Sequence, residues 1–265
     1  MPISSSLEST FCNLTSAVSF SSTDYVGHLL GPRSMELQDT YLRLDQTIAD
    51  FLTYLDKTVG KGNYLLFLTA DHAGAENVIY LKDRKYNVDN YPSKDVKKSL
   101  QDFSTKTFGV DLILNYSNFN IYFNKSLIKD KGLELVKVKQ AFKEFLITQP
   151  QVKRVYTEEE ILANSGNDYY LNFVAKGYDV TQDGDLVVVD KPGDIEYSAT
   201  GTSHGTPYSY DTHVPAIFYG WHIKKGESYD KKAITEIAPT IAQKIKVTFP
   251  NGTEAKVMQE ILDQK

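Results

Sequence analysis

Five residues of types that bind metal ions lie in three short polar motifs. Asp24 and His28 are four residues apart, Asp71 and His72 are adjacent, and His204 stands between a serine and a glycine. Carboxylate oxygens and imidazole nitrogens together suit Zn²⁺ where one coordination position must stay open for water or substrate. Two such groups at one edge of a sheet could hold two metal ions about 3.5–4 Å apart, an arrangement that hydrolyses phosphate esters.

Each motif alone also has a purely structural interpretation. The segment Asp24–His28 could be a turn that caps a helix, and the pair Asp71-His72 could cap the loop after a strand. His213 could be a core histidine bonded to a neighbouring aspartate, and it is also an alternative to His204 as a ligand. The joint occurrence of the motifs, each beside a predicted strand, favours a metal site over separate structural roles.

The elements that must position these motifs follow from the apolar pattern. Leu14 to Phe20 is expected to be a short buried strand that leaves through the polar loop Ser21 to Asp24. Ser34 to Val59 carries apolar residues at steps of three and four, which predicts a long amphipathic helix. Tyr64 to Thr69 is a continuous apolar run, which favours a strand covered on both faces, as in a parallel sheet. The first third therefore predicts a strand–helix–strand unit with polar motifs at the strand ends, where ligands bind in open α/β sheets.

The rest of the chain predicts further helices and strands of an α/β fold. The predicted helices are 93–107, 133–146 and 234–245, and the predicted strands are 111–115, 120–123, 153–156, 186–189 and 214–219. We expect one α/β domain over residues 1–265, with an insertion at about 74–151.

The composition is that of an ordinary globular chain, and it excludes some classes of binding partner. With 29 basic and 34 acidic residues the net charge is −5, and no long basic run is present, which argues against a nucleic-acid polymer as partner. Cys12 is the single cysteine, so an internal disulfide is excluded. No apolar run reaches the roughly 18–20 residues that cross a bilayer, so no membrane partner is expected. The segment Met1–Thr10 lacks the basic residues and apolar core of a signal peptide.

The motifs, taken in this order, resemble those of the alkaline phosphatase superfamily. The nearest branch is the type I phosphodiesterase/nucleotide pyrophosphatase-like alkaline phosphatases. The resemblance runs from about Thr15 to Leu262, and it implies an α/β sandwich with a mostly parallel central sheet. The segments that carry it are Thr23–His28 with Gly31-Pro32, Phe67–His72, Gly201–Gly220 and Ile237–Thr240.

This resemblance implies a zinc-dependent phosphate ester hydrolase of the phosphomonoesterase type, with a phosphodiesterase or nucleotide pyrophosphatase as the alternative. Asp24, His28 and His204 match the ligands of one zinc, and Asp71 and His72 match two ligands of a second. In the family the second zinc is also held by an earlier Asp and by a Thr or Ser nucleophile, which forms a covalent phospho-enzyme. Members of the family are exported, usually to the periplasm.

The sequence departs from the family's pattern at its beginning. The 23 residues before Asp24 contain no Asp, and their threonines lack the family's surroundings for the nucleophile. The chain therefore resembles the C-terminal portion of such an enzyme, incomplete at its N-terminus, with a complete first zinc site and an incomplete second one. A catalytically inactive metal-binding fragment is a further alternative, and an uncovered strand edge predicts self-association.

Overall fold

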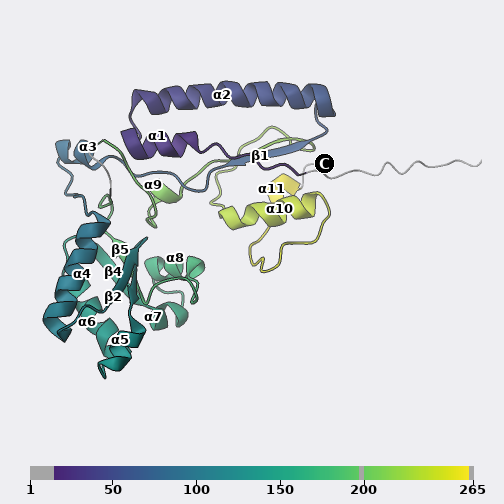
Figure 1. Cartoon of the computed structure of the whole chain (residues 1–265). Coiled ribbons are helices and arrows are strands. Elements are labelled where there is room, and N and C mark those ends of the chain that lie inside the picture. Colours follow the sequence, from purple (N-terminus) through teal and green to yellow (C-terminus); the bar gives the residue numbers. More distant parts are fainter. Residues whose placement is uncertain (1–14, 197–199, 263–265) are drawn as a thin grey trace, which may run out of the picture.

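The computed structural model describes residues 15–196 and 200–262, which form an α/β fold (Figure 1). The strands are β1 (Leu65–Thr69), β2 (Ile113–Ser117), β3 (Asn120–Phe123), β4 (Val152–Thr157), β5 (Leu186–Asp190) and β6 (Ala216–Gly220). The helices are α1 (Ser22–Leu30), α2 (Met35–Leu55), α3 (Val78–Asp83), α4 (Ser93–Phe108), α5 (Lys125–Asp130), α6 (Leu135–Ile147), α7 (Glu158–Leu162), α8 (Tyr169–Gly177), α9 (Ser209–Thr212), α10 (Ile237–Lys244) and α11 (Gln259–Leu262). A π-helical turn follows α2 at Asp56–Gly60, and a 3₁₀ turn precedes α10 at Ile234–Glu236.

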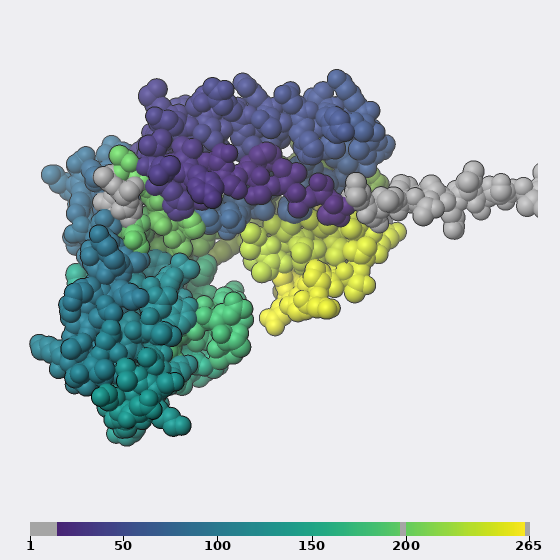
Figure 2. Space-filling model, in the orientation of Figure 1, coloured from purple at the N-terminus to yellow at the C-terminus, as the bar shows by residue number. Residues whose placement is uncertain are grey.

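The elements fall into two lobes that Figure 2 shows separated by a hollow over part of their length. We call residues 15–77 and 200–262 the histidine lobe, because all five histidines lie in it. Residues 93–190 form the four-stranded lobe, which contains β2 to β5 and α4 to α8. The two lobes are joined by the segments 78–92 and 191–196.

Two helices and a ribbon of two strands frame the histidine lobe. Ser34 caps α2 by accepting a hydrogen bond from the backbone N–H of Leu37 at 3.2 Å. β1 and β6 pair antiparallel, with Leu65 opposite Gly220 and Thr69 opposite Ala216. α2 and α10 lie on opposite sides of β1 (Figure 1). This arrangement places the loop after β1 and the loop before β6 at the same end of the ribbon.

A glycine lets the turn between α1 and α2 approach the loop that precedes β6. Gly31 has a φ of +84°, and a Cβ there would lie 2.6 Å from the carbonyl oxygen of Thr200. A side chain at this position would therefore push α1 away from the segment that carries His204.

The four-stranded lobe holds most of the buried apolar side chains. Its strands run in the order β2-β3-β5-β4 with antiparallel pairing throughout. Phe142 of α6 is fully buried and its ring contacts those of Phe103, Phe108 and Phe123. This core lies between one face of the sheet and the helices α4, α5 and α6.

The expected mostly parallel central sheet is wrong, because every strand pair in the described residues is antiparallel and only the isolated bridge Asn90–Ile195 is parallel. The apolar run of β1 lacks alternation, and this is the feature that predicts a parallel strand. A continuous apolar run indicates that both faces of a strand are covered. It does not determine whether the neighbouring strand runs parallel or antiparallel.

The first predicted strand is also wrong. Thr15 to Phe20 has neither helix nor strand, Leu14 lies outside the described residues, and α1 already begins at Ser22. The polar residues taken as a loop after a strand are instead the start of a helix. The expected strand–helix–strand unit is therefore helix–helix–strand in the structure.

The other predicted elements agree with the structure to within a few residues at their ends. Six short helices, α3, α5, α7, α8, α9 and α11, were not predicted. β4 and β5 share a sheet with β2 and β3, while the single domain with an insertion at 74–151 stays a prediction. Within the described ranges, no helix has the length and apolar character needed to cross a membrane.

Candidate metal centre

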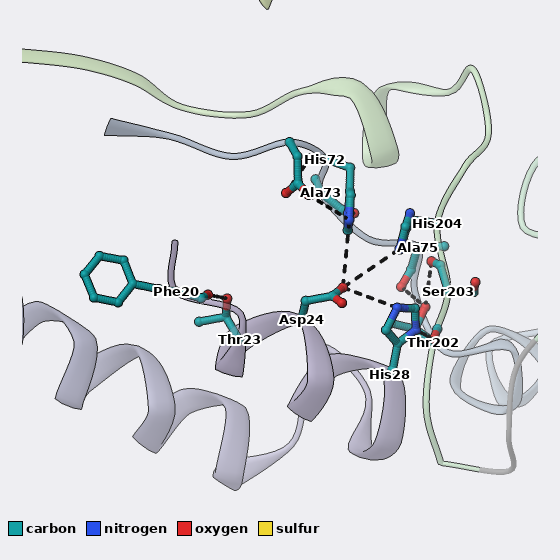
Figure 3. Close-up of polar contacts among 11 residues, drawn as sticks. Phe20, Thr23, Asp24, His28, His72, Ala73, Ala75, Thr202, Ser203 and His204 are labelled. Carbon is teal, nitrogen blue, oxygen red and sulfur yellow. Dashed lines mark hydrogen bonds and ion pairs between the residues drawn. The ribbon is translucent and has the colours of Figure 1, made fainter. Parts of the chain in front are cut away.

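The first two candidate ligands share one face of α1. Asp24 and His28 are one helical turn apart, so their side chains are neighbours. His28 Nε2 lies 3.3 Å from Asp24 Oδ1 (Figure 3). The other ring nitrogen, Nδ1, is 2.9 Å from the carbonyl oxygen of Thr202. A carbonyl oxygen can only accept, so Nδ1 donates in this contact, and Nε2 is the ring nitrogen that faces Asp24.

His204 is brought to the same place by the loop before β6. Its Nε2 lies 3.9 Å from Asp24 Oδ1, and its ring is 5.1 Å from the ring of His28. One possible ligand atom from each of Asp24, His28 and His204 lies within 4.8 Å of the other two. These three residues form the metal cluster.

His72 lies at the edge of the metal cluster, in the loop after β1. Its Nε2 is 3.9 Å from Asp24 Oδ1 and 3.7 Å from Asp71 Oδ2. Its Nδ1 is 2.8 Å from the carbonyl oxygen of Ala73, and its ring stacks on that of His204 at 3.3 Å between centroids. The side chain of Asp71 is 89% exposed, so the adjacent pair presents one inward-facing imidazole and one carboxylate at the surface.

Hydrogen bonds between loops fix the relative positions of the candidate ligands. The backbone N–H of Ala73 donates to the carbonyl of Asp211 at 2.8 Å, and that of Ala75 donates to Ser203 at 3.1 Å. The Thr202 hydroxyl donates to the Ala75 carbonyl at 2.6 Å. Thr202 is buried and touches both sides of the site, since its own carbonyl accepts from His28. It therefore links α1, the loop after β1 and the loop before β6.

Burial and neighbouring imidazoles shift the pKa values of His204 and Asp211. Desolvation, followed by the proximity of His72 and His28, lowers the pKa of His204, which favours the neutral ring that a metal ligand requires. Desolvation raises the pKa of the buried carboxyl of Asp211, while the hydrogen bonds from Thr206, followed by the nearby His204 and His72, partly oppose this.

Asp211 also has an unsatisfied atom. Its Oδ2 accepts hydrogen bonds from the backbone N–H and the hydroxyl of Thr206, at 2.8 and 2.6 Å. Its Oδ1 is buried and has no hydrogen-bond partner among the described residues. A buried carboxylate beside two histidines is the kind of second layer that supports metal ligands.

The donor set of the metal cluster fits a zinc ion. Two ligands at about 2.0–2.1 Å from a tetrahedral zinc are roughly 3.3–3.4 Å apart, which matches the 3.3 Å between Asp24 Oδ1 and His28 Nε2. One carboxylate and two imidazoles leave a fourth position open. His204 Nε2 lies farther from Asp24 Oδ1, at 3.9 Å, so only the first pair has this tetrahedral spacing.

The structure thus brings Asp24, His28 and His204 together with His72 beside them, while Asp71 stays outside the metal cluster. His213 ends α9, where its backbone N–H donates to the Ser209 carbonyl, and it is not in the metal cluster. The ligand roles of all five residues stay predictions. Asp211, considered from the sequence as a partner of His213, instead accepts hydrogen bonds from Thr206. Thr202 was not singled out from the sequence, because it reaches His28 through its backbone carbonyl, which no residue type encodes.

Comparison with known proteins places this site in a family. The family described as Type I phosphodiesterase / nucleotide pyrophosphatase matches residues 15–214. The chain is 40% identical over 247 residues to alkaline phosphatase PafA of Elizabethkingia meningoseptica, covering 92% of this chain and 45% of that protein. It is 39% identical over 251 residues to a Myroides odoratus protein named calcium-transporting ATPase (94% and 46%), and 37% identical over 246 residues to alkaline phosphatase PhoV of Synechococcus elongatus (93% and 44%).

The crystal structure of wild-type PafA superposes with a TM-score of 0.86 at 40% identity, covering 91% of this chain and 46% of that one. The chain thus spans less than half the length of the curated relatives it matches. The family match includes Asp24, His28, Asp71, His72 and His204. On this match the chain belongs to the type I phosphodiesterase/nucleotide pyrophosphatase family of the alkaline phosphatase superfamily.

Proposed function

We propose that this chain is part of a zinc-dependent phosphate ester hydrolase of the phosphomonoesterase type. Asp24, His28 and His204 hold one zinc, and Asp71 and His72 contribute to a second. The observation that carries the proposal is the metal cluster, in which three donor atoms lie within 4.8 Å of one another. The names of two relatives, PafA and PhoV, support phosphatase chemistry.

A bound zinc supplies charge neutralisation to a transferring phosphoryl group and lowers the pKa of a coordinated hydroxyl or water. The chain's own contribution is positioning. The carbonyls of Thr202 and Ala73 fix the orientations of His28 and His72, and the carboxylate of Asp24 lies between the imidazoles. Phosphoryl transfer depends on such positioning and on electrostatics more than on covalent help from the protein.

The nucleophile of the covalent route is proposed to come from outside the described residues. Two threonines near the metal cluster have hydroxyls that are engaged elsewhere (Figure 3). The Thr23 hydroxyl donates to the Phe20 carbonyl at 3.3 Å, and the Thr202 hydroxyl donates to the Ala75 carbonyl at 2.6 Å. The chain by itself is therefore expected to bind zinc at the first site and to hydrolyse phosphate esters very slowly.

A phosphodiesterase or nucleotide pyrophosphatase is the second candidate, favoured by the description of the family that matches. A metal-binding fragment without catalysis is the third, favoured by the exposure of Asp71. The substrate in the first two cases is a small phosphate ester, and the resemblance to exported enzymes supports a periplasmic or secreted location.

A chimera separates these candidates. The matched region of PafA is replaced by residues 15–262 of this chain, and zinc content is measured together with hydrolysis of an aryl phosphate monoester and diester. Zinc-dependent hydrolysis that favours the monoester and is lost in Asp24→Ala is expected. Preference for the diester would favour the second candidate. A folded chimera that binds zinc without hydrolysing either ester would favour the third and contradict the hydrolase proposal.

A further inference from the structure

A pocket of about 220 Å³ lies between the four-stranded lobe and the loop that carries His204. It is lined by residues 118–120 of the β2–β3 hairpin, 187–189 of β5, 205–207 of the loop before β6 and side chains at the end of α8. We call it the Phe119 pocket. Because Gly205 directly follows His204, one wall of this pocket continues into the metal cluster.

The hairpin holds an aromatic residue in an unusual backbone conformation. Asn118 and Phe119 are the two residues between β2 and β3, and their φ angles are +47° and +63°. Two-residue hairpins with a positive φ at both positions favour Asn-Gly, because a bulky side chain at such a φ is strained. Strain of this kind is common at ligand clamps. The geometry of the turn therefore does not account for a phenylalanine at position 119.

The ring of Phe119 joins the hairpin to the loop that carries His204. A Cβ on Gly205 would lie 3.4 Å from Cε2 of Phe119, so the ring lies directly beside the residue that follows His204. The carbonyl of Phe119 accepts a hydrogen bond from the backbone N–H of Val188 at 2.8 Å, which fixes the hairpin loop on β5. The ring thus forms a fixed wall between β5 and the metal cluster.

The surface of the Phe119 pocket is largely apolar. Besides Phe119 it includes Phe173, Val174, Pro207 and the three valines of β5. No lysine, arginine or histidine of the described residues lines it. A phosphate group would meet no cation inside this pocket, so an uncharged part of a ligand fits it better.

Several polar side chains of the lining already have hydrogen-bond partners. The Asn120 side-chain carbonyl accepts from the backbone N–H of Gly184 at 2.9 Å, and the Tyr178 hydroxyl donates to the Gly184 carbonyl at 2.9 Å. The Thr206 hydroxyl donates to Asp211 at 2.6 Å. Recognition in the pocket therefore depends on shape and apolar contact.

The volume limits the size of the occupant. An engineered apolar cavity of about 150 Å³ in another protein binds benzene. The Phe119 pocket, at about 220 Å³, therefore has room for one aromatic ring with a short linker. The open end of α8 agrees with this, since a Cβ added at Gly177 would meet no atom within 4 Å.

We propose that the Phe119 pocket binds the uncharged, ring-sized apolar group of a phosphate ester whose phosphate lies at the metal cluster. The substrate class is thus a monoester of a small aromatic or aliphatic alcohol. The assignment of the phosphate rests on the proposed function. The affinity of the pocket for an apolar ring requires neither zinc nor catalysis, so it is measured separately.

Binding of 4-fluorobenzyl alcohol to the chain, followed by fluorine NMR with and without zinc, tests the pocket. Phe119→Gly removes the ring while suiting the positive φ, and Gly177→Leu fills the open space beside α8. Each is expected to weaken binding about tenfold, whether or not zinc is present. Lys176→Leu is the matched control, because it adds the same side chain beside Gly177 but outside the lining. Circular dichroism establishes that the variants fold.

Hydrolysis by the chimera described above tests the substrate class. Benzyl phosphate and methyl phosphate both release a primary alcohol, so the ratio of their kcat/KM values measures recognition of the ring. Phe119→Gly and Gly177→Leu are expected to lower kcat/KM for benzyl phosphate about tenfold more than that for methyl phosphate. Lys176→Leu is expected to leave the ratio unchanged.

Three results would overturn the proposal. The first is a folded chain that does not bind the alcohol, and the second is equal weakening by Gly177→Leu and Lys176→Leu. The third is an active chimera in which Phe119→Gly changes the hydrolysis of both esters equally, which would leave the hydrolase proposal intact. A chimera that hydrolyses neither ester, while the chain binds the alcohol through Phe119, would instead contradict the hydrolase proposal and support the pocket.

Discussion

The two lobes are built on different principles. The four-stranded lobe contains a continuous core of buried side chains from four strands and three helices, and it contains no histidine. The histidine lobe carries the whole metal cluster, yet the buried apolar residues in its described part are few: Leu37, Ala75, Ile237, Pro239, Ala242 and Met258. Its loops are held by backbone and side-chain hydrogen bonds around Thr202 and Asp211.

The four-stranded lobe thus holds most of the buried core, while the histidine lobe holds the candidate metal site. Apolar burial is the main source of folding free energy, so the four-stranded lobe is expected to fold cooperatively from its own core. The ligand geometry depends instead on a small number of directed hydrogen bonds in half-exposed surroundings. Mutations in one lobe should therefore leave the measured property of the other nearly unchanged.

The largest expected effect is on the core of the four-stranded lobe. Phe142→Ala removes a fully buried ring and leaves a cavity, which should lower the free energy of unfolding by about 3–5 kcal/mol. Phe67→Ala in β1 removes a ring that is already half exposed and should cost about 1 kcal/mol or less. Urea unfolding followed by circular dichroism measures both. Equal decreases in the free energy of unfolding would contradict the view that the four-stranded lobe holds the main core.

A buried carboxyl at the end of β5 makes the stability of the four-stranded lobe pH-dependent. Desolvation, followed by the proximity of Asp194, raises the pKa of Asp190 from 3.8 to about 7. The folded state thus binds the proton more tightly than the unfolded state, so stability is full below the unfolded pKa and is lost as pH rises through about 7. Asp190→Asn removes this loss.

At pH 8 Asp190→Asn should raise the free energy of unfolding by up to about 4 kcal/mol, and at pH 4 it should have little effect. Thermal unfolding at the two pH values gives the comparison. A gain of the same size at both pH values would show that ionisation of Asp190 is not its cause.

Loss of a ligand tests the histidine lobe. His28→Ala removes one of three donors from the metal cluster and should weaken zinc binding by about 100-fold or more, or roughly 3 kcal/mol. His213→Ala is the matched control, because that ring is outside the metal cluster. Competition titration with a zinc indicator measures both affinities, and the unfolding of the four-stranded lobe should be the same in each variant. If His213→Ala weakened zinc binding more than His28→Ala does, His213 and not His28 would be the ligand.

The smallest expected effect concerns the support of the ligands. Thr202→Val removes the hydroxyl that ties the loop before β6 to Ala75 but keeps the backbone carbonyl that accepts from His28. Zinc affinity should fall about 10-fold, at the lower end of the range for outer-layer partners of metal ligands. Thr202→Ser keeps the hydroxyl and should restore most of the affinity. Equal affinities in the valine and serine variants would assign the residue a packing role instead.

The sequence predicted some parts of this molecule because the relevant forces are local. The apolar stripe from Leu37 to Leu55 predicted α2, and the alternation around Asn118 predicted the β2–β3 hairpin. The start of α1 was missed because Ser, Thr and Asp are as common at helix N-termini as in loops. The partner of β1 lies far along the chain in β6, and nothing in an apolar run determines whether that partner is parallel or antiparallel.

The candidate site was likewise predicted only in part. The residue types and spacing singled out Asp24, His28 and His204, which the fold brings together. The exposed position of Asp71 was not foreseen, because exposure depends on how the loop after β1 meets neighbouring segments. Thr202 was not foreseen either, since its contact with His28 uses an atom that every residue has.

If Asp24, His28 and His204 form a zinc site held by contacts between loops, the zinc content of the chain depends on Asp24 and not on Asp71. Elemental analysis after dialysis measures zinc per chain in the wild type, Asp24→Ala and Asp71→Ala. We expect one tightly bound zinc in the wild type and in Asp71→Ala, and none in Asp24→Ala. Zinc retained in Asp24→Ala but lost in Asp71→Ala would contradict this and would assign the primary site to the loop after β1.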